Sequence, residues 1–239
     1  MNKVHSSPRQ RRRELRIEEI LEAAEQLLEE GGPDHLTIAR LAEALDYTVG
    51  AVYRYFPSKG AILAEVELRQ VAEVTEVLEA ALDRAAAALE GSRLNQRRRS
   101  LVPILLLAET YALLPFQHPR AFAALSLGLA RDGRLTSAGD DQQVMERVQP
   151  FLTRVAELFG RARETGVLTP GSDADRAIRL WALLHGATSL RRLEPTDSRF
   201  APGPDLALEL TDDWLHACGA PRRALEAARR FLDRMGDPT

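Results

Sequence analysis

The stretch Thr37–Lys59, TIARLAEALDYTVGAVYRYFPSK, constrains the fold of this 239-residue chain more than any other part. Its first residue is a favourable N-cap, and the apolar residues behind it recur at three- and four-residue spacing, which predicts a short helix. Asp46 follows where the chain must leave that helix, because Asp tolerates the left-handed backbone conformation better than most residues. Thr48 is a second N-cap, and Pro57 ends the helix that follows it. The stretch therefore predicts two short helices joined by a tight turn.

Helix, three-residue turn and helix is the geometry of a DNA-reading helix-turn-helix. The second helix is predicted over Val49–Phe56 and is too short to hold a core on its own. We expect Val52 and Phe56 to point inward. The exposed side of that helix then carries Val49, Gly50, Tyr53 and Arg54.

This stretch resembles the N-terminal DNA-binding domain of the TetR family of bacterial one-component regulators. The matching residues stand in unbroken register and are Thr37, Leu41, Ala42, Thr48, Gly50, Tyr53, Phe56, Ser58 and Lys59. Asp46 departs from the pattern, since the family usually has Gly there, and this would tighten or tilt the turn slightly. The resemblance implies an all-α protein with a three-helix DNA-binding domain and a C-terminal helical bundle for ligand binding and dimerisation. We expect a disordered arm over 1–8, the DNA-binding domain over 9–57 and the bundle over 58–239.

Backbone contacts to DNA are expected from four of these residues. Thr37 and Thr48 lie at helix N-termini, where a hydroxyl and free backbone N–H groups meet phosphate. The Tyr53 hydroxyl and the Lys59 ammonium are also within phosphate reach. Such contacts position a protein on DNA but carry no sequence information.

Base reading is expected from the second helix of the pair. Arg54 suits the O6 and N7 atoms of guanine, and Val49 suits a thymine methyl group. Gly50 permits close approach. The pattern leaves open whether Tyr47 and Tyr55 contact DNA, and Tyr55 could equally brace the helix. The resemblance implies DNA contacts at positions 37, 49, 50, 53, 54 and 59.

The net charge of −3 means that any DNA contact must come from a local basic patch. Residues 1–16 hold six Lys and Arg residues and a single acid, Glu14. We interpret 1–8 as a solvated tail and Arg9–Arg16 as a segment that contacts phosphate or the minor groove. The second basic cluster, 93–99, is interpreted as a solvated loop.

Helices account for the rest of the chain. A first helix over Arg9–Glu30, with Leu15 in its apolar stripe, ends at Gly31-Gly32-Pro33, and a long helix runs from Ser58 to about Leu89. The nearly all-apolar segment Leu101–Leu114 predicts a buried central helix, after which Pro115 and Pro119 break the chain. Further helices are predicted at 121–130, 142–164, 173–193 with Asp173 as cap, 205–217 and 221–235, with loops at 131–139 and 195–204.

A ligand site is expected in this bundle. The segment Trp181…His185-Gly186 resembles a signature found in a subset of TetR proteins, which implies a helix near both the dimer interface and a ligand cavity. The candidate ligand-binding residues are Tyr111, Phe122, Phe151, Trp181 and His185. The alternative is that these side chains are core residues and that His185 is a satisfied core histidine.

Catalytic, metal and cofactor sites are not predicted. None of the five His residues stands at metal-ligand spacing, and no phosphate loop, nucleophile elbow or HExxH motif occurs. The single cysteine, Cys218, fits a reducing cytoplasm. We see no secretory signal pattern, and Leu101–Leu114 is too short and too polar to span a membrane.

The sequence thus predicts a cytoplasmic, ligand-responsive transcriptional regulator that is not an enzyme. We expect a homodimeric repressor that binds a palindromic operator in double-stranded DNA and is released by a small hydrophobic effector. The alternative is a helical ligand-binding or protein-partner module that keeps the helix-turn-helix shape without recognising an operator. The effector, the operator, the target genes and the choice between repression and activation are not specified by these residues.

Overall fold

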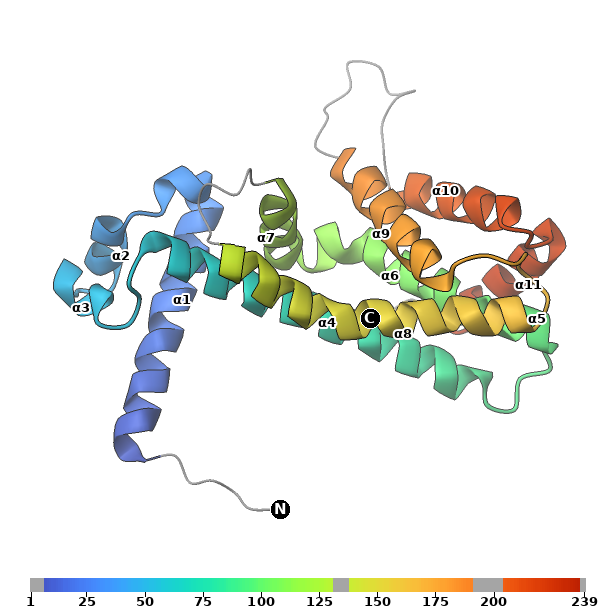
Figure 1. Cartoon of the computed structure of the whole chain (residues 1–239), viewed down its shortest axis with the longest axis horizontal. Coiled ribbons are helices and arrows are strands. Elements are labelled where there is room, and N and C mark those ends of the chain that lie inside the picture. Colours follow the sequence, from blue (N-terminus) through green and yellow to red (C-terminus); the bar gives the residue numbers. More distant parts are fainter. Residues whose placement is uncertain (1–6, 131–137, 191–203, 237–239) are drawn as a thin grey trace. The chain divides into compact units, whose positions relative to one another are not determined.

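The computed structural model describes residues 7–130, 138–190 and 204–236, and every regular element within them is a helix (Figure 1). The predicted all-α fold is therefore confirmed. The chain divides into two compact units. Unit 1 comprises residues 1–70 and 127–145, and unit 2 comprises residues 71–126 and 146–239.

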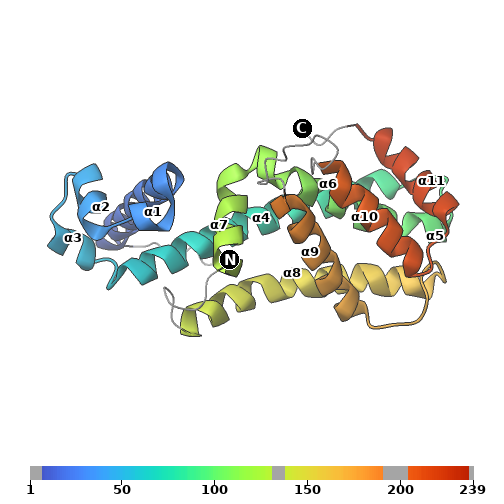
Figure 2. The same ribbon diagram turned by 90° about the horizontal axis from the view of Figure 1, so that it is seen from above.

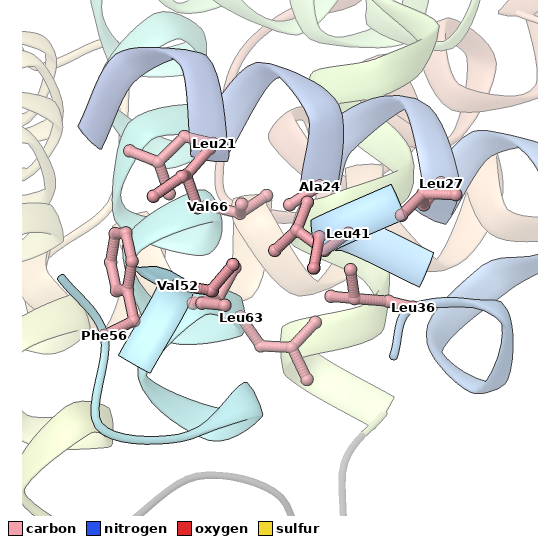
Figure 3. Close-up of a cluster of buried hydrophobic side chains, with 12 residues drawn as sticks. Leu21, Ala24, Leu27, Leu36, Leu41, Val52, Phe56, Leu63 and Val66 are labelled. Carbon is pink, nitrogen blue, oxygen red and sulfur yellow. The ribbon is translucent and has the colours of Figure 1, made fainter. Parts of the chain in front are cut away.

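Unit 1 is built around the helix-turn-helix. The helices that form its core are α1 (Pro8–His35), α2 (Ile38–Ala44), α3 (Val49–Tyr53) and the beginning of α4 (Lys59–Leu89). All four contribute apolar side chains to one core, which Figure 3 shows in close-up. The fully buried members include Ile20 of α1, Leu41 of α2, Val52 of α3 and Ile62 of α4. The short helices α2 and α3 are thus held by packing on α1 and α4, as their length requires.

The turns of unit 1 lie at the residues where the sequence predicted them. The helical conformation of α1 is interrupted at Gly31 and Gly32, where φ reaches +70° at Gly32, and a last turn then continues to His35. Asp46 has a φ of +54°, so it adopts the left-handed conformation predicted for it. The helix α3 ends at Tyr53 and not at Phe56 as expected. Arg54 is its C-cap, and the backbone hydrogen bonds beyond Arg54 belong to a turn.

The N-terminal half of α1 is exposed. Ser7 caps the helix by accepting a hydrogen bond from the backbone N–H of Gln10 at 3.2 Å, while residues 1–6 lie outside the described part of the chain. The placement of Leu15 in the buried stripe was wrong, since 62% of its surface is exposed. At about 100° per residue, Leu15 lies about 140° around the helix from Ile20, so its side chain is on the side of α1 that faces away from the core.

Unit 2 is a helical bundle around α6 (Val102–Gln117). It also contains α4 from Val71 onward, α5 (Gln96–Arg99), most of α7 (Pro119–Ala130), most of α8 (Ala138–Glu164), α9 (Asp173–Ser189), α10 (Pro204–Ala217) and α11 (Arg222–Asp233). Helices α9, α10 and α11 all pack on α6 (Figure 2). Most of α6 is buried, which confirms the prediction from its all-round apolar character.

Three local predictions in unit 2 were wrong. Pro115 does not break the chain but lies in the last turn of α6, which ends two residues later at Gln117. The segment expected to be a loop at 93–99 contains α5, whose cap Asn95 accepts from the N–H of Arg98 at 3.0 Å. Ser172, not Asp173, caps α9, accepting from the N–H of Asp175 at 3.1 Å. The predicted loop at 131–139 falls mostly outside the described residues, as does nearly all of the one at 195–204.

One segment has the length and hydropathy of a membrane-spanning helix. Gln96–Gln117, counted through α5 and α6, reaches that length although its apolar run alone does not. Of its most apolar window, 67% is buried inside the protein. That burial is the behaviour of a core helix of a globular bundle, which passes the same test of composition.

Candidate functional site

Two threonine hydroxyl groups cap the helices of the helix-turn-helix. The Thr37 side chain accepts a hydrogen bond from the backbone N–H of Arg40 at 3.1 Å, and that of Thr48 accepts from Ala51 at 3.2 Å. Both residues are exposed. Because a hydroxyl is both donor and acceptor, each Oγ1 keeps a proton to donate to an incoming acceptor.

The outer face of α3 is exposed as the sequence predicted. Val49 and Tyr53 expose 44% and 51% of their surface, and Gly50 and Arg54 are also exposed. On the opposite face, Val52 is fully buried, and Phe56 in the turn beyond the helix is buried with it, which confirms the predicted inward positions. Two apolar or aromatic side chains, a glycine and a guanidinium group are therefore presented together to solvent.

None of the residues that the structure describes gives a steric reason for glycine at position 50. A Cβ atom added there would meet no heavy atom within 4 Å. Its backbone has an ordinary helical conformation and not a left-handed one. The described residues therefore leave room for a larger side chain at position 50.

Lys59 makes a contact that the sequence did not reveal. Its Nζ donates a hydrogen bond to the backbone carbonyl oxygen of Pro33 at 2.6 Å. The bond joins the first turn of α4 to the segment behind the glycine break of α1. A lysine ammonium group has three donors, so two remain for other acceptors.

A second unexpected cluster braces the turn between α2 and α3. The Tyr47 hydroxyl in that turn donates to Glu19 Oε2 at 2.8 Å and accepts from Arg16, whose guanidinium also lies 5.4 Å from the centre of the tyrosine ring. Arg16 and Glu19 form an ion pair at 2.7 Å. The hydrogen bond from Arg16 lowers the pKa of the Glu19 carboxyl group. Arg16 therefore has two partners within the protein, Tyr47 and Glu19.

Unit 2 contains a narrow apolar pocket. The pocket and the open solvent at its mouth together occupy about 590 Å³. Four helices, α4, α6, α8 and α9, supply nearly all of its wall. The lining residues are Val71, Val74, Thr75, Leu78, Leu107, Tyr111, Leu125, Val148, Phe151, Leu152, Val155, Ala177, Leu180, Trp181 and Leu184.

Three of the five predicted ligand residues line this pocket, namely Tyr111, Phe151 and Trp181. Phe122 and His185 are not in the wall but pack against each other, with ring centres 5.5 Å apart. The rings of both also meet the Tyr111 ring. The structure thus joins four of the five residues in one aromatic cluster at the edge of the pocket.

Hydrogen bonds connect the polar atoms of this cluster. The indole N–H of Trp181 donates to Tyr111 Oη at 3.2 Å, and Tyr111 Oη lies 3.0 Å from Nδ1 of His185. Burial raises the pKa of the Tyr111 hydroxyl well above its ordinary value of 10, and the bond from Trp181 opposes this only in part. The phenol therefore stays neutral, and its polar edge is largely satisfied by protein groups.

Among the described residues, no group of three or more His, Cys, Asp or Glu side chains is placed to hold a metal ion. Cys218 is a free, half-buried thiol.

Comparison with known proteins identifies the family to which the helix-turn-helix belongs. The sequence model described as "Bacterial regulatory proteins, tetR family" matches residues 20–66. Residues 20–66 belong to the TetR family. The match spans the core of unit 1 from Ile20 of α1 to Val66 of α4, and it confirms the resemblance drawn from the sequence.

The TetR-like fold extends over most of the chain. A TetR-family regulator, PfmR from Thermus thermophilus, is 20% identical, with a TM-score of 0.57 over 82% of this chain and 97% of that one. SmeT, the repressor of the Stenotrophomonas maltophilia multidrug efflux pump SmeDEF, is 22% identical, with a TM-score of 0.58 over 84% and 89%. A protein with unknown function from a Rhodococcus species is 20% identical and covers 92% and 100%, with a TM-score of 0.63. No curated protein sequence matches the chain.

The general class of function follows from the TetR domain, because this is a family of DNA-binding transcriptional regulators. Members of that class are generally not enzymes.

Proposed function

We propose that this TetR-family protein is a repressor that binds a palindromic DNA operator as a homodimer and leaves it when a small hydrophobic effector binds. The observation that carries the proposal is the exposed face of α3, where Val49, Gly50, Tyr53 and Arg54 stand together on a helix of a TetR domain. Such a protein acts in the cytoplasm, where it meets DNA.

Contacts to the phosphate backbone are assigned to Thr37, Thr48, Tyr53 and Lys59. The two threonines keep a hydroxyl proton at a helix N-terminus, and Lys59 keeps two donors after its bond to Pro33. Base reading is assigned to Arg54 and Val49. Gly50 lets the groove approach the backbone of α3, which accounts for a glycine that no neighbour in the chain requires.

Exposed apolar side chains on the outer face of α9 favour a dimer interface there. Ile178 and Leu190 expose 47% and 45% of their surface, and Gly186 lies between them with open space around its Cα. Glycine in the interior of a helix costs about 1 kcal/mol relative to alanine. A partner helix that packs closely on this face would offset that cost. Leu210 of α10, the helix that packs beside α9, is also 40% exposed.

The apolar lining of the pocket favours an effector without charge. Its wall is almost entirely aliphatic and aromatic, and the polar atoms of Tyr111 and Thr75 already bond to protein groups. A charged ligand would lose its hydration there without compensation. We propose Tyr111, Phe151 and Trp181 as ligand contacts, with Phe122 and His185 holding the Tyr111 ring from behind.

Helix α4 is the proposed link between ligand and DNA. Its residues Ile62, Leu63 and Val66 belong to the core of unit 1, and Val71, Val74 and Leu78 line the pocket. A ligand that displaces the pocket-lining residues of α4 also shifts the start of the same helix, which packs in the core of unit 1. An effector acts in this way only if its affinity differs between the two states of the protein.

The deciding experiment is selection from a random duplex library by the purified protein, followed by sequencing of the retained DNA. An enriched inverted repeat establishes a dimeric DNA reader and supplies a probe with which effectors are screened. Retention without an enriched sequence at moderate salt leaves only phosphate binding. That result would favour a helical module that keeps the helix-turn-helix shape without recognising an operator.

A further inference from the structure

The basic cluster 93–99 lies at one end of the bundle in unit 2 (Figure 1). It contains four arginines and no acidic residue, and three of the arginines belong to α5. None of the four forms an ion pair with a described residue, since the bonds of Arg97 and Arg99 go to backbone and hydroxyl oxygens. In a chain with a net charge of −3, this cluster creates a local positive potential that the proposed DNA and effector sites do not use.

An open cleft adjoins the cluster. Its walls come from the C-terminal ends of α4 and α8, from α5 and from the first turn of α6. It shares no lining residue with the apolar pocket. The charged residues of the lining are Arg99, Arg161 and Glu164. The apolar residues of the lining are Leu89, Pro103 and Leu158. The cleft therefore combines an excess of positive charge with an apolar surface.

Arg99 keeps most of its hydrogen-bond donors. Its Nη1 donates to the carbonyl oxygen of Ser92 at 3.4 Å and to Ser92 Oγ at 3.2 Å, which holds the half-buried side chain against the connection from α4 to α5. A guanidinium group has five N–H donors, so the Nε–H and both Nη2–H groups remain without a bond to any described residue. Two parallel N–H groups of a guanidinium match the two oxygens of a carboxylate.

The end of α8 beside the cleft is capped by a cation. Carbonyl groups at the C-terminus of a helix carry a partial negative charge, which disfavours an anion. Nε of Arg97 donates to the carbonyl oxygen of Thr165 at 3.1 Å, and Thr165 Oγ1 donates to that of Ala162 at 2.8 Å. Because these carbonyl groups have donors within the protein, the arginines of the lining dominate the electrostatics of the cleft.

The balance of charge in the lining fits a ligand with a single negative charge. The exposed Arg161 pairs with Glu157 at 4.0 Å, and such a surface pair is weak enough to leave the guanidinium available. Glu164 is also exposed and would repel the second charge of a phosphate. A carboxylate carries one charge, and an apolar group attached to it would lie on the apolar part of the lining.

We propose that this cleft binds a small carboxylic acid with an apolar body, whose carboxylate is held by Arg99 and Arg161. The site is separate from the apolar pocket and from the proposed operator interface, and it takes a ligand of the opposite character to the uncharged effector.

The test measures binding of 4-fluorobenzoate to the unchanged protein by fluorine NMR at neutral pH, beside its uncharged counterpart 4-fluorobenzamide. We expect a dissociation constant of about 1 mM for the benzoate and binding of the benzamide that is at least about tenfold weaker. R99Q should weaken benzoate binding by about tenfold or more. The control R84Q removes an exposed arginine of α4 outside the cleft and should leave the affinity unchanged.

Two further variants change one exposed charge of the lining each. R161Q should weaken benzoate binding about two- to fivefold, and E164Q should strengthen it by a similar factor. A gain of affinity in E164Q is a result that damage to the fold does not produce. If circular dichroism shows that R99Q is unfolded, the opposite changes in R161Q and E164Q decide the question.

Equal binding of benzoate and benzamide would refute the site, because apolar surface alone would then account for the binding. Equal losses in R99Q and R84Q would refute it as well, as would the absence of benzoate binding up to about 10 mM. None of these measurements involves DNA, so the failure of this proposal is distinct from the failure of the proposed function.

Discussion

The ammonium group of Lys59 donates a hydrogen bond to the backbone carbonyl oxygen of Pro33 at 2.6 Å. The two residues are 26 positions apart, and their bond ties the start of α4 to the segment that leads into α2. Lys59 therefore has a structural partner in addition to its proposed phosphate.

Replacing Lys59 with methionine should lower both stability and DNA affinity. The half-buried Pro33 carbonyl loses a charged donor, which costs about 1–3 kcal/mol of unfolding free energy. Affinity should fall for all duplex sequences alike, with a flatter salt slope. Urea denaturation and salt-dependent binding measure the two effects. Wild-type stability in K59M would mean that the bond to Pro33 contributes nothing.

Replacing Arg54 with alanine should act on specificity alone. Arg54 is exposed and is the C-cap of α3, so its side chain supports no core contact. We expect a cost of about 1–3 kcal/mol at one base pair of the operator and little change in the salt slope beyond one charge. Binding to a panel of operators mutated at single positions measures this. If R54A and K59M weaken all of these sequences equally, the division between reading and positioning residues is wrong.

Replacing Ile178 with glutamate should disrupt the proposed dimer. The residue exposes 47% of its surface, so the change leaves the protomer folded, whereas a buried carboxylate at an interface is costly. Sedimentation velocity should show monomers at micromolar concentration where the unchanged protein is dimeric. The matched control is L15E on α1, which is 62% exposed and outside the proposed interface. If I178E forms dimers as stable as those of the unchanged protein, the dimer interface does not include this face of α9.

Replacing Val148 with phenylalanine should fill the pocket. Val148 is a half-buried lining residue of α8, so the larger side chain of phenylalanine takes up part of the space in which an apolar ligand would lie. We expect the neutral dye N-phenyl-1-naphthylamine to bind about tenfold more weakly, a loss of about 1.4 kcal/mol. The control V77F enlarges a half-buried residue of α4 outside the lining. Equal dye binding in V148F and the unchanged protein would show that the pocket does not hold apolar ligands.

The buried phenol of Tyr111 should make the fold sensitive to alkali. Its pKa is raised in the folded protein, whereas the unfolded chain has the ordinary value of about 10. Above pH 10 the unfolded state releases this proton and the folded state keeps it, so the unfolding free energy falls as pH rises, by up to about 1.4 kcal/mol per pH unit. Y111F should be less stable at neutral pH, since Trp181 loses an acceptor, but its stability should decline less between pH 10 and 11. The exposed-face variant Y53F should decline like the unchanged protein.

Several features of the site were predictable because they depend on neighbours in the sequence. Helical spacing placed Val52 inside and Val49 and Tyr53 outside, and the backbone preference of aspartate predicted the left-handed turn at Asp46. The apolar run before Pro115 predicted a buried helix, although not that the helix would continue through the proline. Proline disfavours the interior of a helix, but the packing of α6 in the bundle outweighs this preference at Pro115. The backbone hydrogen bond that proline cannot make costs least there, because the helix ends two residues later.

The sequence by itself determined the class of fold, the TetR-type domain and the residues on the face of α3, since each of these follows from periodicity, capping and spacing within a few turns. Only the tertiary structure decided which side chains meet across long separations. Arg16 and Tyr47 are 31 residues apart, Lys59 and Pro33 are 26 apart, and Tyr111 and Trp181 are 70 apart. Such pairs are selected by the packing of whole helices, which brings donors and acceptors together with no signal in the local pattern.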